Sequence, residues 1–177
     1  MSPIPPLVWI SAVCFQLTNT TQIAGFLAGY GPVDSADWAG RRATLVVGFI
    51  VFVLGLAGNI YHDDELRELR RAAARKEKER ELSRAGDEGN KEGWKRVYLM
   101  PESGLFKFIL YPHYFCELIE WAGYWVIGGP QCVPARNFFV NEVAALLPLA
   151  LFGRRWYIER FGKEKVGNRK AMIPGVI

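Results

Sequence analysis

The feature that most constrains this chain is an uncharged run that ends abruptly in a highly charged one. Residues 43–61 carry no formal charge, and residues 62–71 then read HDDELRELRR. As a helix with a rise of about 1.5 Å per residue, a run of that length just crosses the roughly 30 Å hydrocarbon core of a bilayer. The junction therefore predicts a helix that leaves a membrane and continues into water.

Four polar side chains follow one face of this exit helix. Asn59, Asp63, Arg67 and Arg70 are separated by steps of four, four and three, which stack side chains along one side of a helix. Two guanidinium groups at the water boundary suit a phosphorylated ligand on the cytosolic side. Arg and Lys beside a span also commonly contact lipid headgroups and nothing else. The stripe alone fits both interpretations.

Composition excludes several classes of function. Half of the 177 residues are hydrophobic, and the 22 Lys and Arg residues are interleaved with 18 acidic ones rather than gathered into a nucleic-acid-binding face. The cysteines Cys14, Cys116 and Cys132 are odd in number and widely spaced, without the spacing of a metal site. We expect them to be buried, reduced apolar residues.

Three further apolar segments, residues 7–30, 104–129 and 137–153, predict an all-α membrane protein with about four transmembrane helices. Polar residues cluster in the middle of the first segment, where a helix-packing seam and a cavity wall are equally good interpretations. In the 43–61 span, Gly48 and Gly55 share a face, which predicts close contact with neighbouring helices. Glu142 and Pro148 weaken the last segment.

The 104–129 segment carries His113, Glu117 and Glu120 on one expected helical face. Such groups are costly near hydrocarbon unless they are paired or solvated. A metal site, the polar lining of a cavity and an interfacial helix facing water all compete. A metal is disfavoured because no second cluster of His or Cys completes a coordination shell. We favour the lining.

Charge also predicts the orientation. The 62–103 loop and the tail after residue 153 are richer in Arg and Lys than the 129–136 connection, which places loop, tail and both chain ends in the cytosol. Arg41 and Arg42 argue weakly the other way. Residues 63–85 predict a solvated, charge-alternating helix that ends at Gly86 and Gly89.

Several blocks, in order, resemble the steroid 5α-reductase family (3-oxo-5α-steroid 4-dehydrogenases). They are GNIYHD followed by LRELRR at the exit helix, PESGLF at 101–106, YFCELIEWAGY at 114–124, and WYIERF and RKAMIP at 156–161 and 169–174. The resemblance implies a seven-span membrane enzyme of the endoplasmic reticulum. Such an enzyme uses NADPH to reduce a carbon–carbon double bond conjugated to a carbonyl in a lipid substrate, such as a 3-oxo-4-ene steroid.

The resemblance also implies which residues bind NADPH. Enoyl-thioester and polyprenal reductases share much of this pattern, so the substrate class stays open. His113 stands where many members have an asparagine near the nicotinamide, and either side chain can hydrogen-bond an amide. The implied cofactor-binding residues are Asn59, Asp63, Arg67, Arg70, Tyr98, His113 and Tyr157.

Several residues depart from the family's pattern, and these departures affect the activity that we expect of this chain. Leu99 stands where many members have a basic residue, residues 151–153 lack a histidine cluster, and residues 72–94 form a charged helical insertion. Residues 1–177 correspond to the family's C-terminal part, without the first three spans and the tyrosine and glutamate that engage the substrate carbonyl. We therefore assign no catalytic residue, with Glu117 and Tyr124 as loose candidates. We expect weak NADPH binding and no turnover by the chain alone. The alternative is a non-catalytic membrane scaffold or partner subunit.

Overall fold

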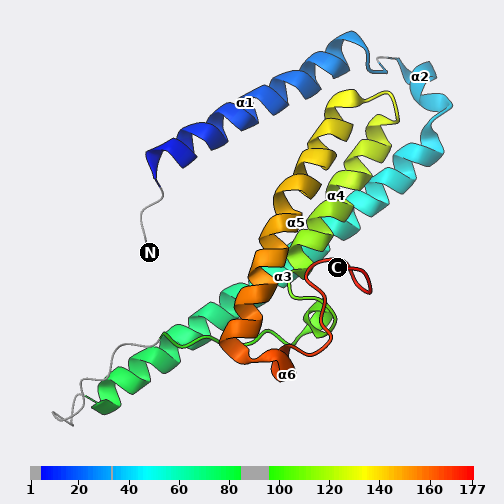
Figure 1. The fold of residues 1–177 in the computed structure, drawn as a ribbon. Coiled ribbons are helices and arrows are strands. Elements are labelled where there is room, and N and C mark those ends of the chain that lie inside the picture. Colours follow the sequence, from blue (N-terminus) through cyan, green and yellow to red (C-terminus); the bar gives the residue numbers. More distant parts are fainter. Residues whose placement is uncertain (1–4, 33, 85–95) are drawn as a thin grey trace. The chain divides into compact units, whose positions relative to one another are not determined.

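The computed structural model describes residues 5–32, 34–84 and 96–177. The regular secondary structure in this part of the chain consists of helices (Figure 1). The one strand-like feature within it is an isolated parallel bridge between Ile109 and Lys170. The all-α prediction is therefore confirmed for these residues. The elements are α1 (Pro6–Gly29), α2 (Ser35–Ala39), α3 (Arg42–Arg84), the 3₁₀ turn η1 (Gly104–Lys107), α4 (Pro112–Gly128), α5 (Val133–Phe161) and α6 (Lys163–Val166).

The chain divides into two compact units, which are described separately. The first comprises Met1–Leu56 and Glu117–Leu146, and the second comprises Ala57–Cys116 and Leu147–Ile177. Helices α3, α4 and α5 each contribute residues to both units. All seven residues implied to bind a cofactor belong to the second unit.

Two of the described helices are long and apolar enough to cross a membrane, α3 over Arg42–Ser83 and α5. This supports a membrane environment, whereas the expected number of about four spans stays a prediction. Helix α3 joins the uncharged run to its charged extension without a break, as the junction predicted. Exposed ion pairs join Arg67 to Asp64 and Arg71 to Glu68 along the extension. The expected end at Gly86 and Gly89 and residues 85–94 of the 72–94 insertion lie outside the described residues.

The 104–129 segment is not one helix, contrary to the expectation. Its first residues form η1, the next pair with the C-terminal segment, and α4 begins only at Pro112. Leu110 N–H donates to the Lys170 carbonyl and Tyr111 N–H to the Ala171 carbonyl, each at 2.9 Å. Proline disfavours helical geometry in the residue before it but fits a helix start. The local chemistry of Pro112 therefore fixes the break.

The last apolar segment also differs from its predicted limits. Helix α5 begins at Val133 and continues to Phe161, with Pro148 inside it. A proline inside a helix removes one backbone hydrogen bond and usually kinks or breaks the helix. Here the helix continues past it, so Pro148 does not shorten the segment as expected.

The first unit confirms the prediction of close helix contact through glycine. A Cβ built on Gly123 of α4 would lie 2.4 Å from the backbone nitrogen of Phe52 and 2.8 Å from the carbonyl oxygen of Gly48, both in α3. No larger side chain fits at Gly123 without moving a backbone. Helix α1 has no buried residue, so its polar cluster supports neither of the two interpretations. Cys116 and Cys132 are buried free thiols as expected, whereas Cys14 is exposed.

Candidate functional site

The exit-helix stripe lies on α3 within the second unit. Asn59 is half-buried, while Asp63, Arg67 and Arg70 are exposed. Arg67 donates to the Asp64 carboxylate at 2.6 Å, and both side chains are more than half exposed. A pair this exposed contributes little stability, so it leaves the Arg67 guanidinium available for exchange with another anion.

His113 is the second residue of α4, and its imidazole is buried with 9% of its surface exposed. Its ring lies 4.3 Å from that of Tyr114 and 5.6 Å from that of Tyr111, measured between centroids. Asp63 and Arg70 are close enough to act on the imidazole electrostatically. The Nδ1 atom of His113 is buried and has no hydrogen-bond partner among the described residues. Buried polar atoms are nearly always bonded, so this nitrogen stands out as a buried group whose hydrogen-bonding capacity the described residues do not use.

Tyr157 comes from α5 and is buried to the same extent as His113. Its ring meets that of Tyr111 edge-on at 6.0 Å, and it belongs to the apolar cluster of Met100, Leu110 and Val166. The charge of Arg70 also acts on the Tyr157 hydroxyl. Three helices thus bring Asp63, Arg70, His113 and Tyr157 together, and we call these four residues the exit-helix cluster.

Tyr98 lies in the extended segment before η1 and keeps 42% of its surface exposed. The Trp156 ring meets it edge-on at 5.1 Å, and Trp156 in turn meets Tyr157 at 5.2 Å. Tyr98 is therefore linked to the exit-helix cluster through two ring contacts. The other two implied residues, Asn59 and Arg67, are related to the exit-helix cluster only through the helix α3 that they share with Asp63 and Arg70.

His62 is a buried residue beside the exit-helix stripe that the sequence reasoning did not single out. It is 4% exposed, its Nδ1 lies 2.6 Å from the Gly58 carbonyl oxygen, and its Nε2 accepts from the Leu105 N–H at 3.2 Å. Three residues along α3, Glu65 accepts a hydrogen bond from the Ser103 hydroxyl. These contacts hold the turn at 103–105 against the helix that carries Asp63. The spacing of 58, 62 and 65, which marks one helical face, was the signal that could have found it.

Two arginines that the sequence reasoning also missed organise the C-terminal segment. Arg169 donates from Nη1 to the Pro101 carbonyl at 3.0 Å, and Arg154 donates from Nε to the Arg169 carbonyl at 3.1 Å. These bonds connect the segment before η1, α5 and the tail. They hold together the two segments that carry Tyr98 and Tyr157, the segment before η1 and α5.

Tyr111 fills a space that glycine leaves open on α5. A Cβ built on Gly153 would lie 1.7 Å from the Tyr111 hydroxyl oxygen. Tyr111 precedes α4, and its burial raises the pKa of its hydroxyl above the usual range, with Tyr157 and Tyr114 adding to the effect. Tyr111 thus packs beside both His113 and Tyr157.

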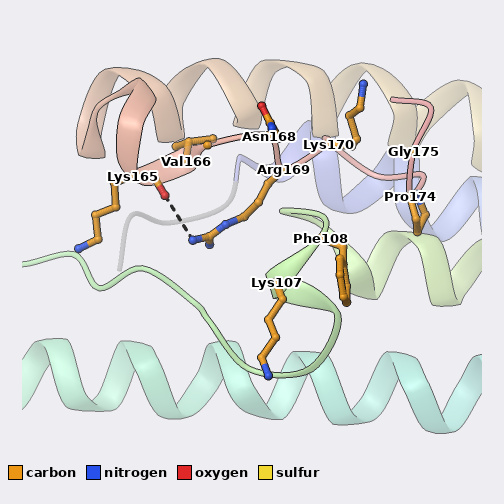
Figure 2. A pocket seen from close by; sticks show the side chains of 10 residues that line it. Lys107, Phe108, Lys165, Val166, Asn168, Arg169, Lys170, Pro174 and Gly175 are labelled. Atoms are coloured by element: carbon orange, nitrogen blue, oxygen red, sulfur yellow. Dashed lines mark hydrogen bonds between the residues drawn. The ribbon is translucent and has the colours of Figure 1, made fainter.

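A pocket of about 420 Å³ lies on the C-terminal side of the second unit. Figure 2 shows that the side chains of Lys107, Lys165 and Lys170 point in different directions, while Arg169 bends toward the Lys165 carbonyl. Its ammonium groups do not converge on one point, so the pocket is not an anion clamp. No residue of the exit-helix cluster is among those that line it. The loose catalytic candidates Glu117 and Tyr124 belong to the first unit.

Comparisons with known proteins show which family the chain resembles over nearly its whole length. A family model described as 3-oxo-5-alpha-steroid 4-dehydrogenase matches residues 2–86 and 88–177. An uncharacterized protein of Schizosaccharomyces pombe is 34% identical over 174 residues, which cover 98% of this chain and 58% of that protein. The steroid 5-alpha-reductase DET2 of Solanum lycopersicum is 28% identical, covering 96% and 56%. The 3-oxo-5-alpha-steroid 4-dehydrogenase 2 of Rattus norvegicus is 28% identical, covering 97% and 58%. The chain thus spans somewhat more than half the length of these relatives, and it belongs to the 3-oxo-5-alpha-steroid 4-dehydrogenase family.

Proposed function

We propose that this chain carries the NADPH-binding part of a membrane reductase, which reduces a carbon–carbon double bond conjugated to a carbonyl in a lipid substrate. The substrate class we propose is a 3-oxo-4-ene steroid, in line with the names of the relatives. The observation that carries the proposal is the exit-helix cluster, in which a buried imidazole with an unpartnered Nδ1 lies within electrostatic reach of exposed Arg70.

The chemistry of these side chains fits a nicotinamide dinucleotide. Arg67 and Arg70, one helical turn apart, would bind phosphate oxygens, since guanidinium groups form strong bidentate bonds with phosphate. His113 would hydrogen-bond a carboxamide through Nδ1, the atom left without a partner. Along the same face, the Asn59 amide would donate or accept hydrogen bonds and the Asp63 carboxylate would accept them. When bound, the reduced coenzyme supplies the hydride for the reaction.

The buried part of the cluster favours such a reaction because it keeps water away. His113 and Tyr157 are each 9% exposed, and Tyr111 packs beside both. A dry, fixed environment strengthens each hydrogen bond and holds the reacting groups in one orientation. Tyr98 and Tyr157, on either side of Trp156, would line the coenzyme site.

We propose a multi-pass location in the membrane of the endoplasmic reticulum, with about four spans that form the C-terminal part of a seven-span fold. The apolar α3 and α5 support insertion into a bilayer. The long loop and the tail would face the cytosol, where the exposed arginines of α3 can meet a water-soluble coenzyme. The substrate would enter from the lipid.

The test is coenzyme binding by the full chain reconstituted in lipid. Replacing Arg67 and Arg70 together by Gln should raise the Kd for NADPH about tenfold or more, because each charged hydrogen bond contributes about 1.5–3 kcal/mol. The matched control replaces Arg75 and Arg80, which are exposed on the charged extension of the same helix. That control should change the Kd little. Equal losses from the two pairs would reveal a general effect of surface charge and remove the case for a site.

The substrate class is tested separately, by NADPH oxidation in the presence of 3-oxo-4-ene steroids or enoyl thioesters. The proposal predicts oxidation that depends on the 3-oxo-4-ene steroid once a relative's N-terminal spans are supplied. Oxidation that depends on the enoyl thioester alone would overturn the proposed substrate class. Complete absence of NADPH binding by the unaltered chain would instead favour the non-catalytic scaffold.

A further inference from the structure

Arg160 is exposed on α5 and yet is held in a defined position. Its guanidinium carbon lies 4.6 Å from the centroid of the Tyr98 ring, a cation–π contact. Its Nη2 donates to the Arg96 carbonyl oxygen at 2.6 Å. Trp156 supports the same tyrosine ring edge-on from the preceding turn of the helix. Two contacts therefore fix an arginine that would otherwise sample many rotamers.

No carboxylate of the described residues forms a salt bridge with Arg160. The salt bridges within the described residues join Asp64 to Arg67 and Glu68 to Arg71, and neither involves Arg160. A guanidinium carries several N–H donors, of which one donates to the Arg96 carbonyl. Within the part of the chain that the structure describes, the remaining donors and the positive charge are thus available to a ligand.

Contacts between aromatic rings also connect Arg160 to the exit-helix cluster. Tyr98 contacts Trp156, Trp156 contacts Tyr157, and the charge of Arg70 acts on Tyr157. Two cationic positions, Arg70 on α3 and Arg160 on α5, thus lie at opposite ends of one row of aromatic rings. The row is two ring contacts long, of 5.1 and 5.2 Å.

We propose that Arg160 binds a phosphate group of the coenzyme that is distinct from the phosphates held by Arg67 and Arg70. NADPH carries a diphosphate and, on one ribose, a separate 2′-phosphate, whereas NADH lacks the latter. Arg160, oriented by Tyr98 and the Arg96 carbonyl, is the group that recognises the 2′-phosphate and selects NADPH over NADH. This inference rests on the proposed function, because it concerns the same coenzyme.

The test compares both coenzymes with the full chain in lipid. Arg160→Gln should raise the Kd for NADPH roughly tenfold to a hundredfold, the range for loss of a charge-assisted hydrogen bond, and should leave the Kd for NADH unchanged. Arg160→Lys keeps the charge and should recover part of the preference for NADPH. The matched control is Lys163→Gln, which removes one exposed positive charge three residues away. It should affect neither coenzyme.

The outcomes separate this inference from the proposed function. An equal loss for NADPH and NADH in Arg160→Gln would mean that Arg160 only supports Tyr98, and it would overturn the 2′-phosphate assignment. Tight NADPH binding by Arg160→Gln would overturn it as well, while leaving the proposed function intact. Failure of the unaltered chain to bind either coenzyme overturns both. If Arg160→Gln does not fold, Arg160→Lys decides. A folded Arg160→Lys variant that binds NADPH no more tightly than NADH would overturn the charge-based role, whereas a remaining preference for NADPH would support it.

Discussion

Replacing Gly153 by Ala tests the packing beneath the exit-helix cluster. Two opposing effects decide whether this substitution raises or lowers the free energy of unfolding. Gly153 lies inside α5, where Ala is favoured over Gly by about 1 kcal/mol. A Cβ at this position would lie 1.7 Å from the Tyr111 hydroxyl oxygen, 2.2 Å from Cζ and 2.6 Å from Cε2. Real Cβ atoms do not approach other atoms so closely, so the Tyr111 ring must move.

The ring has little freedom to move. Tyr111 is bound through its backbone to Ala171, stacks on Tyr114 at 5.2 Å and meets Tyr157 edge-on. Overpacking of this kind typically costs about 1–3 kcal/mol. The upper part of that range applies because the overlap involves the hydroxyl oxygen and two ring carbons of Tyr111. Subtracting the gain in helix propensity, we expect Gly153→Ala to lower the free energy of unfolding by about 1–2 kcal/mol.

Thermal or denaturant unfolding of the chain in detergent micelles measures this change. Gly25→Ala is the matched control, since Gly25 lies inside α1 and a Cβ there meets nothing within 4 Å. It should stabilise the chain by up to about 1 kcal/mol. In a Tyr111→Ala background the overlap is gone, so Gly153→Ala should stabilise as well. Stabilisation by Gly153→Ala in the unaltered background would refute the placement of Tyr111 against α5.

Two further predictions concern the turn at 103–105 and the orientation of the chain. His62→Leu should lower the free energy of unfolding by about 1–3 kcal/mol, because the partly buried Leu105 N–H loses its acceptor, whereas Tyr61→Phe should have little effect in the same unfolding assay. A glycosylation acceptor placed within residues 86–92 should stay unmodified in microsomes, because the Arg- and Lys-rich loop is expected on the cytosolic side, and efficient modification would reverse the proposed topology.

Local patterns predicted the features that depend on residues close together in sequence. The uncharged run and its charged continuation form one helix, α3. The sequence could predict this because spacings of three and four residues depend only on residues within the same helix. The Arg71–Glu68 ion pair is found for the same reason. The break before α4 also has a local cause in Pro112, and it was missed because the apolar content of 104–129 outweighed that single residue.

Long-range contacts were not predictable in this way. The bond from Leu105 to His62 joins residues 43 positions apart, and the bond from Arg160 to Arg96 joins residues 64 apart. A histidine after an apolar run, or an arginine near the end of a helix, has no distinguishing pattern of its own. Each becomes informative only when the fold supplies the carbonyl or N–H group that it contacts.

The two interpretations of the α3 stripe can now be weighed on burial. Contact with lipid headgroups needs only exposed cations, and Arg67 and Arg70 would satisfy it. It gives no reason for a buried imidazole with an unpartnered nitrogen beside those cations. The proposed ligand, with a charged end in water and a polar, uncharged end in a dry site, would account for both features, because one end would pair with Arg70 and the other would bond His113. The gradient from exposed arginine to buried imidazole therefore favours a bound dinucleotide over a lipid surface.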